Sequence, residues 1–283
     1  MPAAPASAES TPRPKGGPAP DRATFVPVRT TLPRRPLPPS HSRPHVTTDR
    51  LILRPLVPED LDAIHALRSQ PEVMHWTRLG VPDRDRDETC KKMAAYLSPS
   101  PSPSPSPSQP PPPDSYNCAI CLRATGQLIG VGGCHNWASS LGWPEIGYML
   151  RSEHWGRGLG TEFVRGFVEG VWETLEREVV EGLMVDARTV EGAQAGTGHD
   201  GVRNGEEGEG DGKGKTGGEG MAVVREQLIA ITAEGNGKSQ AVLQKSGFEW
   251  FLTLRAEDRV KGDGDGMINL PTYRYFYKGG KRE

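Results

Sequence analysis

Three low-complexity tracts limit how much of this chain can pack into a core. Residues 1–45 are rich in proline, alanine, serine and arginine, residues 98–113 alternate serine with proline, and residues 191–220 hold twelve glycines and seven acidic residues. Such sequences bury too little apolar surface to offset the conformational entropy of the chain. We therefore expect a disordered tail at 1–45, low-complexity insertions at 98–113 and about 181–222, and a short tail at 279–283.

The segments that remain predict one domain. They cover residues 46–97, 114–180 and 223–278, and the first of them is too short to form a hydrophobic core alone. Long surface loops add little closure entropy, so both internal tracts are compatible with insertions into the loops of a single domain. We expect this domain to span residues 46–278.

Hydrophobic patterning predicts a mixture of strands and helices within this domain. Short apolar runs indicate strands at residues 51–53, 117–123, 127–134, 145–150, 228–232, 248–254 and 272–277. Helical spacing indicates helices that begin near residue 58, at about 87–97, from 161 to about 180, and at 239–245. The order β-α-α-β-β-β-α-β-α-β-β mixes hairpins with crossovers, so it predicts an α+β (mixed α/β) fold with one sheet.

Composition and charge exclude several classes of protein. The net charge of -2 gives no general attraction to nucleic acid or to an anionic membrane. No run approaches the ~18 apolar residues of a membrane span, and the N-terminus lacks the apolar stretch of a secretory signal. Cys118 and Cys121 fall within one predicted strand and have no second ligand pair nearby, which disfavours a zinc site. We expect no metal and a cytoplasmic protein, with the nucleus left open.

One glycine-rich turn, from Trp155 to Thr161, has the features of an anion site. It follows the predicted strand 145–150 and precedes a helix, so its backbone N–H groups and the helix dipole favour a pyrophosphate. Glycine allows close approach of a ligand, and Arg157 adds positive charge. Its G-x-G-x-G spacing differs from that of dinucleotide-binding loops. On this segment alone, a glycine turn without a ligand remains an open alternative.

Five segments, taken in order, resemble the Gcn5-related N-acetyltransferase (GNAT) superfamily, and especially its ribosomal-protein N-terminal acetyltransferases. They are Thr48–Pro55, Pro144–Leu150, Trp155–Glu162, Asn236–Gln240 and Lys245–Phe248. The resemblance implies a GNAT-like domain whose central, mostly antiparallel sheet contains two splayed parallel strands and carries helices on both faces.

The resemblance also implies acetyl-CoA as co-substrate, held in the opening between strands 145–150 and 228–232. It implies contacts from Asn236, which is equally a helix cap, and from two groups of backbone positions. These are Tyr148, Met149 and Leu150 for the pantetheine, and Trp155, Gly156, Arg157, Gly158, Leu159, Gly160 and Thr161 for the pyrophosphate.

The implied reaction is direct attack of a primary amine on the thioester within a ternary complex. Glu145 is the candidate base, directly or through a water, and the alternative is an ordinary strand carboxylate. A backbone N–H near Met149 is the candidate oxyanion donor. Ser239 is the candidate donor to the departing sulfur or a helix cap. The acceptor amine and the oligomeric state stay open, as do two other functions: an acyl-CoA-binding module without catalysis, and an interaction protein.

Overall fold

The computed structural model describes residues 24–97, 115–193, 221–257 and 267–279. The main sheet is built from β2 (Val46–Thr47), β3 (Leu51–Pro55), β4 (Tyr116–Leu122), β5 (Leu128–Asn136), β6 (Glu145–Leu150), β9 (Gln227–Ile231), β10 (Glu249–Glu257) and β11 (Met267–Phe276). The helices are α1 (Leu61–Arg68), α2 (Pro71–Met74), α3 (Arg86–Leu97), α4 (Leu159–Gly170) and α5 (Gly237–Lys245).

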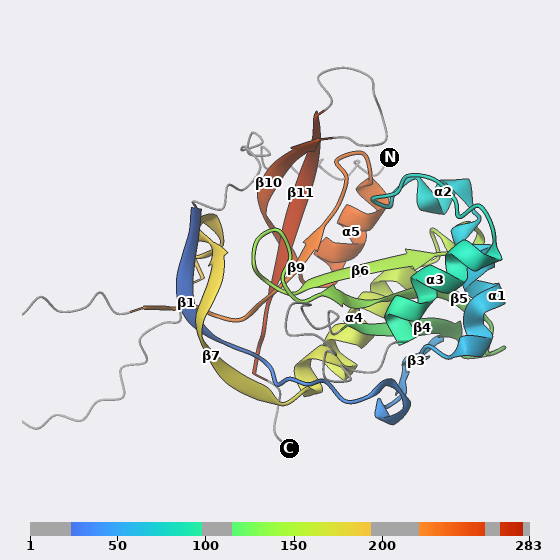
Figure 1. Cartoon of the computed structure of the whole chain (residues 1–283), viewed down its shortest axis with the longest axis horizontal. Helices are drawn as coiled ribbons and strands as arrows, with labels where there is room; N and C mark the ends of the chain where they lie inside the picture. Colours follow the sequence, from blue (N-terminus) through green and yellow to red (C-terminus); the bar gives the residue numbers. More distant parts are fainter. Residues whose placement is uncertain (1–23, 98–114, 194–220, 258–266, 280–283) are drawn as a thin grey trace, which may run out of the picture.

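The eight strands lie in the order β10-β11-β9-β6-β5-β4-β3-β2 (Figure 1). Every neighbouring pair is antiparallel except β6 and β9, which are parallel. The expected mixed α/β fold with a central, mostly antiparallel sheet is therefore confirmed, whereas the expectation of a single sheet is wrong, because a second sheet is present. Within the described residues, no helix combines the length and the apolar character needed to cross a membrane.

Helices cover both faces of this sheet. Helix α4 buries Phe163, Val164 and Phe167 completely, in the same core cluster as Leu243 of α5. Apolar residues spaced three and four apart give α4 the stripe that a sheet-packed helix needs. On the other face, α1 and α3 pack in a separate cluster with residues of β4 and β5, as Figure 1 also shows.

Among the described residues, the parallel strands β6 and β9 pair at a single position, the first residue of β6 and the middle residue of β9. Glu145 lies opposite Ile229, and the Ile229 N–H donates to the Pro144 carbonyl at 2.8 Å. No further β6–β9 pair is formed by the described residues, and the two ribbons diverge in Figure 1. The expectation that 145–150 and 228–232 are splayed neighbours is thus confirmed, and the carboxyl halves of the two strands share no ladder pair. This break in the pairing is called the opening below.

A second, three-stranded sheet corrects the prediction of a disordered tail at 1–45. It has the order β7-β1-β8 and comprises β1 (Phe25–Pro33), β7 (Arg177–Asp186) and β8 (Ala222–Val223). Val28 and Leu32 of β1 are buried in a core cluster that also contains Ile229 of the main sheet. The tail prediction is therefore wrong from residue 25 onward, because pairing with β7 gives these apolar residues a partner that lies far away in the sequence.

The same sheet corrects the predicted helix at 161–180. Helix α4 ends at Gly170, where an added Cβ would lie only 2.5 Å from a methyl group of Val46. The chain then turns and enters β7, so the start of the predicted insertion at about 181–222 belongs to an ordered strand. Residues 187–193 and 221–222 of that insertion are also described, whereas residues 194–220 and the predicted insertion at 98–113 lie outside the described residues.

Candidate functional site

The opening between β6 and β9 is lined by backbone groups of β6. Arg151 donates its N–H to the Ile129 carbonyl of β5 at 2.8 Å. Successive residues of a strand direct their backbone N–H and C=O groups alternately to the two neighbouring strands. The backbone groups of Met149 therefore also face β5, while those of Tyr148 and Leu150 face the opening. The candidate oxyanion donor near Met149 is therefore the N–H of Tyr148 or Leu150 and not that of Met149 itself.

The glycine turn at the end of β6 presents further N–H groups. Gly156 and Gly158 have φ angles of 72° and 78°, which side chains other than glycine rarely adopt. The first hydrogen bond of the α4 ladder is donated by the Glu162 N–H to the Gly158 carbonyl, at 3.1 Å. The amides of residues 159–161 precede it and have no helical carbonyl to bond, so together with the helix dipole they can hold an anion.

An ion pair between Arg50, just before β3, and Glu162 of α4 fixes this turn. Arg50 donates from Nε to Glu162 at 2.7 Å and from Nη1 to the Arg157 carbonyl at 2.9 Å. Thr48 donates to the same carboxylate at 2.6 Å. Burial alone would raise the pKa of Glu162, but these hydrogen bonds outweigh it and lower the pKa. Sequence reasoning missed this anchor, although Thr48 and Arg50 lie in the motif that it quoted for the first strand.

Trp155 folds back onto β6. Its indole N–H donates to the Leu150 carbonyl at 2.7 Å, and the Lys238 ammonium lies 5.1 Å from its ring centroid. The side chain is half-buried and packs at the border of the two core clusters on either face of the sheet. Through these contacts Trp155 supports the end of β6 beside the opening.

A hydrogen bond joins β6 to α5 beside the opening. The Tyr148 and Ser239 hydroxyl oxygens are 2.8 Å apart. Asn236 caps α5, accepting from the Ser239 N–H at 3.1 Å, so the cap role falls to Asn236 and leaves the Ser239 hydroxyl free for other contacts. Burial raises the pKa of Tyr148 to about 12, so the phenol stays protonated at neutral pH.

Glu145 is a largely buried carboxyl with an altered pKa. Its side chain is 17 % exposed, and burial raises its pKa to about 7, although the charge of Arg78 opposes this shift. The Nε2 atom of His135 lies 3.7 Å from Glu145 Oε1, which is close but longer than a hydrogen bond. Burial, and then Arg78, lower the pKa of His135. A carboxyl of this pKa can accept and release protons near neutral pH.

The sequence did not predict that His135 and Arg78 would lie near Glu145. A β-bulge between Cys134 and Asn136 turns His135 toward Glu145. No local sequence pattern predicts this bulge. Along β6, Glu145 and Tyr148 are three residues apart, so their side chains lie on opposite faces of the strand. The site therefore has a proton acceptor on one face and a pair of hydroxyl groups on the other.

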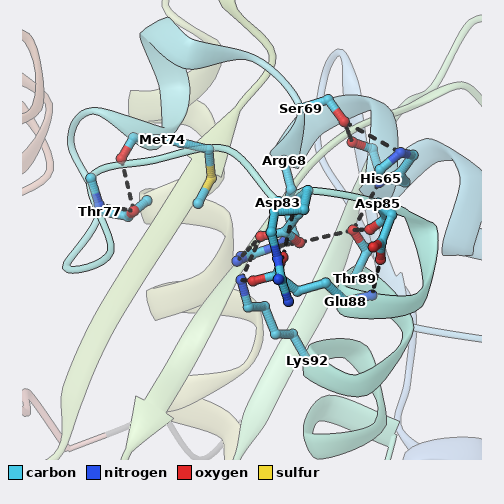
Figure 2. A network of polar contacts seen from close by, with 12 residues as sticks. His65, Arg68, Ser69, Met74, Thr77, Asp83, Asp85, Glu88, Thr89 and Lys92 are labelled. Atoms are coloured by element: carbon cyan, nitrogen blue, oxygen red, sulfur yellow. Dashed lines mark hydrogen bonds and ion pairs between the residues drawn. The ribbon is translucent and has the colours of Figure 1, made fainter.

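A buried ionic network holds the segment that carries Arg78. Asp83 receives two hydrogen bonds from Arg68, at 2.6 and 2.9 Å, and further ones from Lys92 and Thr89 (Figure 2). Its side chain is fully buried, and these bonds outweigh burial and lower its pKa to about 2. The network ties α1 to α3 and thereby fixes both ends of the connection between them.

Comparison with known proteins places these features in a family. The model of the family described as the acetyltransferase (GNAT) domain matches residues 50–249. An acetyltransferase of the GNAT family from Bacillus anthracis is 13 % identical, with a TM-score of 0.51 over 83 % of this chain and 99 % of that one. A GCN5-related N-acetyltransferase from Brucella melitensis is 16 % identical, with a TM-score of 0.52 over 88 % of this chain and 83 % of that one. At these identities the two structures show the shared fold.

Proposed function

The chain belongs to the GNAT acetyltransferase family and is an acetyl-CoA-dependent acyltransferase, and on that premise we propose that it acetylates a primary amine by direct attack within a ternary complex. The acceptor is a protein N-terminus, a lysine or a small amine. The observation that carries the proposal is the glycine turn at the end of β6, whose amides lie beside an opening between two parallel strands.

The residues around the opening fit the coenzyme. The amides of Gly156 to Thr161 suit its diphosphate, because a helix N-terminus and unpaired N–H groups favour a doubly charged anion. The backbone of Tyr148 and Leu150 faces the opening and suits the amide groups of pantetheine. When bound, acetyl-CoA supplies an activated thioester. Everything else in the reaction is left to the side chains and backbone of this chain.

Glu145 takes the proton of the acceptor amine in this proposal, directly or through a water. A pKa of about 7 leaves much of the carboxyl ionised at neutral pH and able to accept a proton. An α-amine has a pKa near ~8 and a lysine amine one near ~10.4, so the transfer is less uphill for an N-terminus. The position of His135, 3.7 Å from the carboxylate, makes it a candidate to share the proton.

Ser239 donates a proton or a hydrogen bond to the departing sulfur. The Tyr148 phenol, 2.8 Å away, can donate to the Ser239 oxygen as the Ser239 proton moves toward the thiolate. A backbone N–H of Tyr148 or Leu150 stabilises the charge that develops on the carbonyl oxygen. Base and acid then act from the two faces of β6, which allows the amine and the leaving group to lie on different sides of the reacting carbon.

A direct assay tests this function. The purified full chain is incubated with acetyl-CoA and a panel of amines: peptides with a free N-terminus, peptides with a blocked N-terminus and a free lysine, and polyamines. Release of CoA thiol and acetylated product, identified by mass spectrometry, is expected for at least one class and is expected to fall in a Glu145→Gln variant. Tight binding of acetyl-CoA without product from any amine would instead support the acyl-CoA-binding module.

A further inference from the structure

A cleft of about 570 Å³ lies beside the glycine turn, on the side away from β9. Its walls come from the start of β3, the β4–β5 turn and the glycine turn itself. In the main sheet, β3 and β4 lie on one side of β6 and β9 lies on the other. The turn that leaves β6 therefore separates this cleft from the opening described above.

The charges on this cleft are mostly positive. Arg50, Arg123 and Arg157 line it, and Asp49 is the single acidic residue of the lining. Arg50 is held by Glu162, but the Arg157 side chain has no hydrogen bond or ion pair within the described part of the chain. Arg123 has one weak bond, 3.4 Å long, to a backbone carbonyl. Two guanidinium groups from different parts of the chain thus line the same cleft.

A neighbouring cleft provides a useful contrast. It is larger, about 790 Å³, and lies along the outer side of α4. Its ionisable lining residues are equal in number for the two signs: Arg50, Arg165 and Lys245 against Asp49, Glu162 and Glu169. Size alone would favour that cleft for a ligand, but charge favours the smaller one for an anion.

We propose that the smaller cleft is a phosphoryl-binding site in which Arg123 and Arg157 grip the phosphate and Arg50 holds the turn in place. Planar guanidinium groups match the oxygen atoms of a phosphate better than a point charge does. The rest of the lining is largely apolar, with Leu122, Ala124 and Leu159, which suits the carbon atoms of an organic phosphate.

This ligand chemistry has two sources. One is the 3′-phosphate of CoA, which is one ribose away from the diphosphate and would reach a cleft that shares Arg157 and Leu159 with the glycine turn. This source rests on the proposed function. The other is a separate phosphate ion or phosphate ester that binds independently of the coenzyme. The two sources predict different results with coenzymes that carry or lack the 3′-phosphate.

The test compares CoA with 3′-dephospho-CoA in titration calorimetry of the full chain and its Arg123→Gln variant. For the coenzyme source, the wild type binds CoA about tenfold more tightly than dephospho-CoA. Arg123→Gln loses most of that preference and binds dephospho-CoA as the wild type does. The matched control, Arg29→Gln, changes an exposed arginine on the second sheet and should leave both affinities unchanged.

Inorganic phosphate tests the other source. Phosphate is titrated into the wild type and into Arg123→Gln, each in the presence of saturating dephospho-CoA. Binding to the wild type but not to the variant supports a site that is independent of the coenzyme. If Arg123→Gln alters neither the preference for CoA nor the binding of phosphate, the proposal is overturned. A wild type that binds neither coenzyme would contradict the proposed function, while the phosphate titration would still decide on the cleft.

Discussion

The hydroxyl groups of Tyr148 and Ser239 lie 2.8 Å apart and link β6 to the first turn of α5. The bond thus joins β6 to the helix that follows β9, and the coenzyme is proposed to enter between these two strands. Tyr148 also packs its ring against Phe163 of α4, with the centroids 5.8 Å apart. The phenol is therefore fixed by the core, and it in turn orients the Ser239 hydroxyl.

Removing only the phenol oxygen tests this arrangement. Tyr148→Phe keeps the ring packing, so we expect acetyl-CoA affinity to change less than about twofold and kcat to fall about tenfold, since one neutral hydrogen bond is lost. Ser239→Ala should lower kcat further. If Tyr148 acts through Ser239, the double variant is no slower than Ser239→Ala in steady-state kinetics. Fully additive losses would argue that Tyr148 acts independently.

Glu145 should govern the pH dependence of the reaction. As the proposed base it works only when ionised, so kcat/KM is expected to rise with pH through about 7. Glu145→Gln should lower kcat/KM by about 10²–10⁴-fold and abolish that rise. The control is Glu153→Gln, which changes a half-exposed carboxylate near the glycine turn. An unaltered pH profile in Glu145→Gln would remove Glu145 as the base.

Glu145 should also make the stability of the fold depend on pH, and stability should fall with rising pH where kcat/KM rises. Its folded pKa is raised, so the folded state retains a proton that the unfolded state has lost between about 4.5 and 7. Stability should therefore decrease as pH rises through this window. Glu145→Gln is expected to be more stable than the wild type at pH 8 in urea denaturation, and a variant that is less stable at that pH would contradict the account.

Asp83 should be essential for the connection between α1 and α3. Asp83→Asn leaves the buried Arg68 without its partner, so we expect unfolding free energy to fall by about 3–5 kcal/mol in urea denaturation. The contribution of Asp83 is present above its unfolded pKa of 3.8 and disappears only as pH falls through about 2. Asp62→Asn removes an exposed ion pair with Arg86 and should cost much less, because solvent screens both charges. Equal losses would contradict this distinction.

Local sequence signals predicted much of the fold and the core of the site. The strand from Glu145 to Leu150 has the bounds that its apolar pattern indicated, and the glycine turn opens a helix as its spacing indicated. The helix predicted at 239–245 ends at Lys245, and Gly247, just after it, has a φ of 85°. In each case the cause is short-range, because strand alternation, helix caps and left-handed glycines depend on a few neighbouring residues.

Features that depend on distant pairing were not predictable in this way. Strand β1 pairs with β7, more than a hundred residues away, and its proline-rich surroundings gave no sign of a strand. His135 reaches Glu145 only because a bulge shifts the register of β5 against β6. Arg78 acts on both groups from the segment that Asp83 anchors. None of these contacts produces a hydrophobic periodicity or a local motif from which it could be predicted.

Acetyl-CoA titration of two glycine variants tests the central claim most directly. Gly158 and Gly182 have φ angles of 78° and 77°, and an added Cβ would approach no atom closer than 3.4 Å at the first and none within 4 Å at the second. Valine at either position therefore costs a similar backbone strain. If the amides of the glycine turn hold the diphosphate, Gly158→Val weakens acetyl-CoA binding at least about tenfold, whereas Gly182→Val binds as the wild type does. A folded Gly158→Val protein with unchanged affinity would contradict the account.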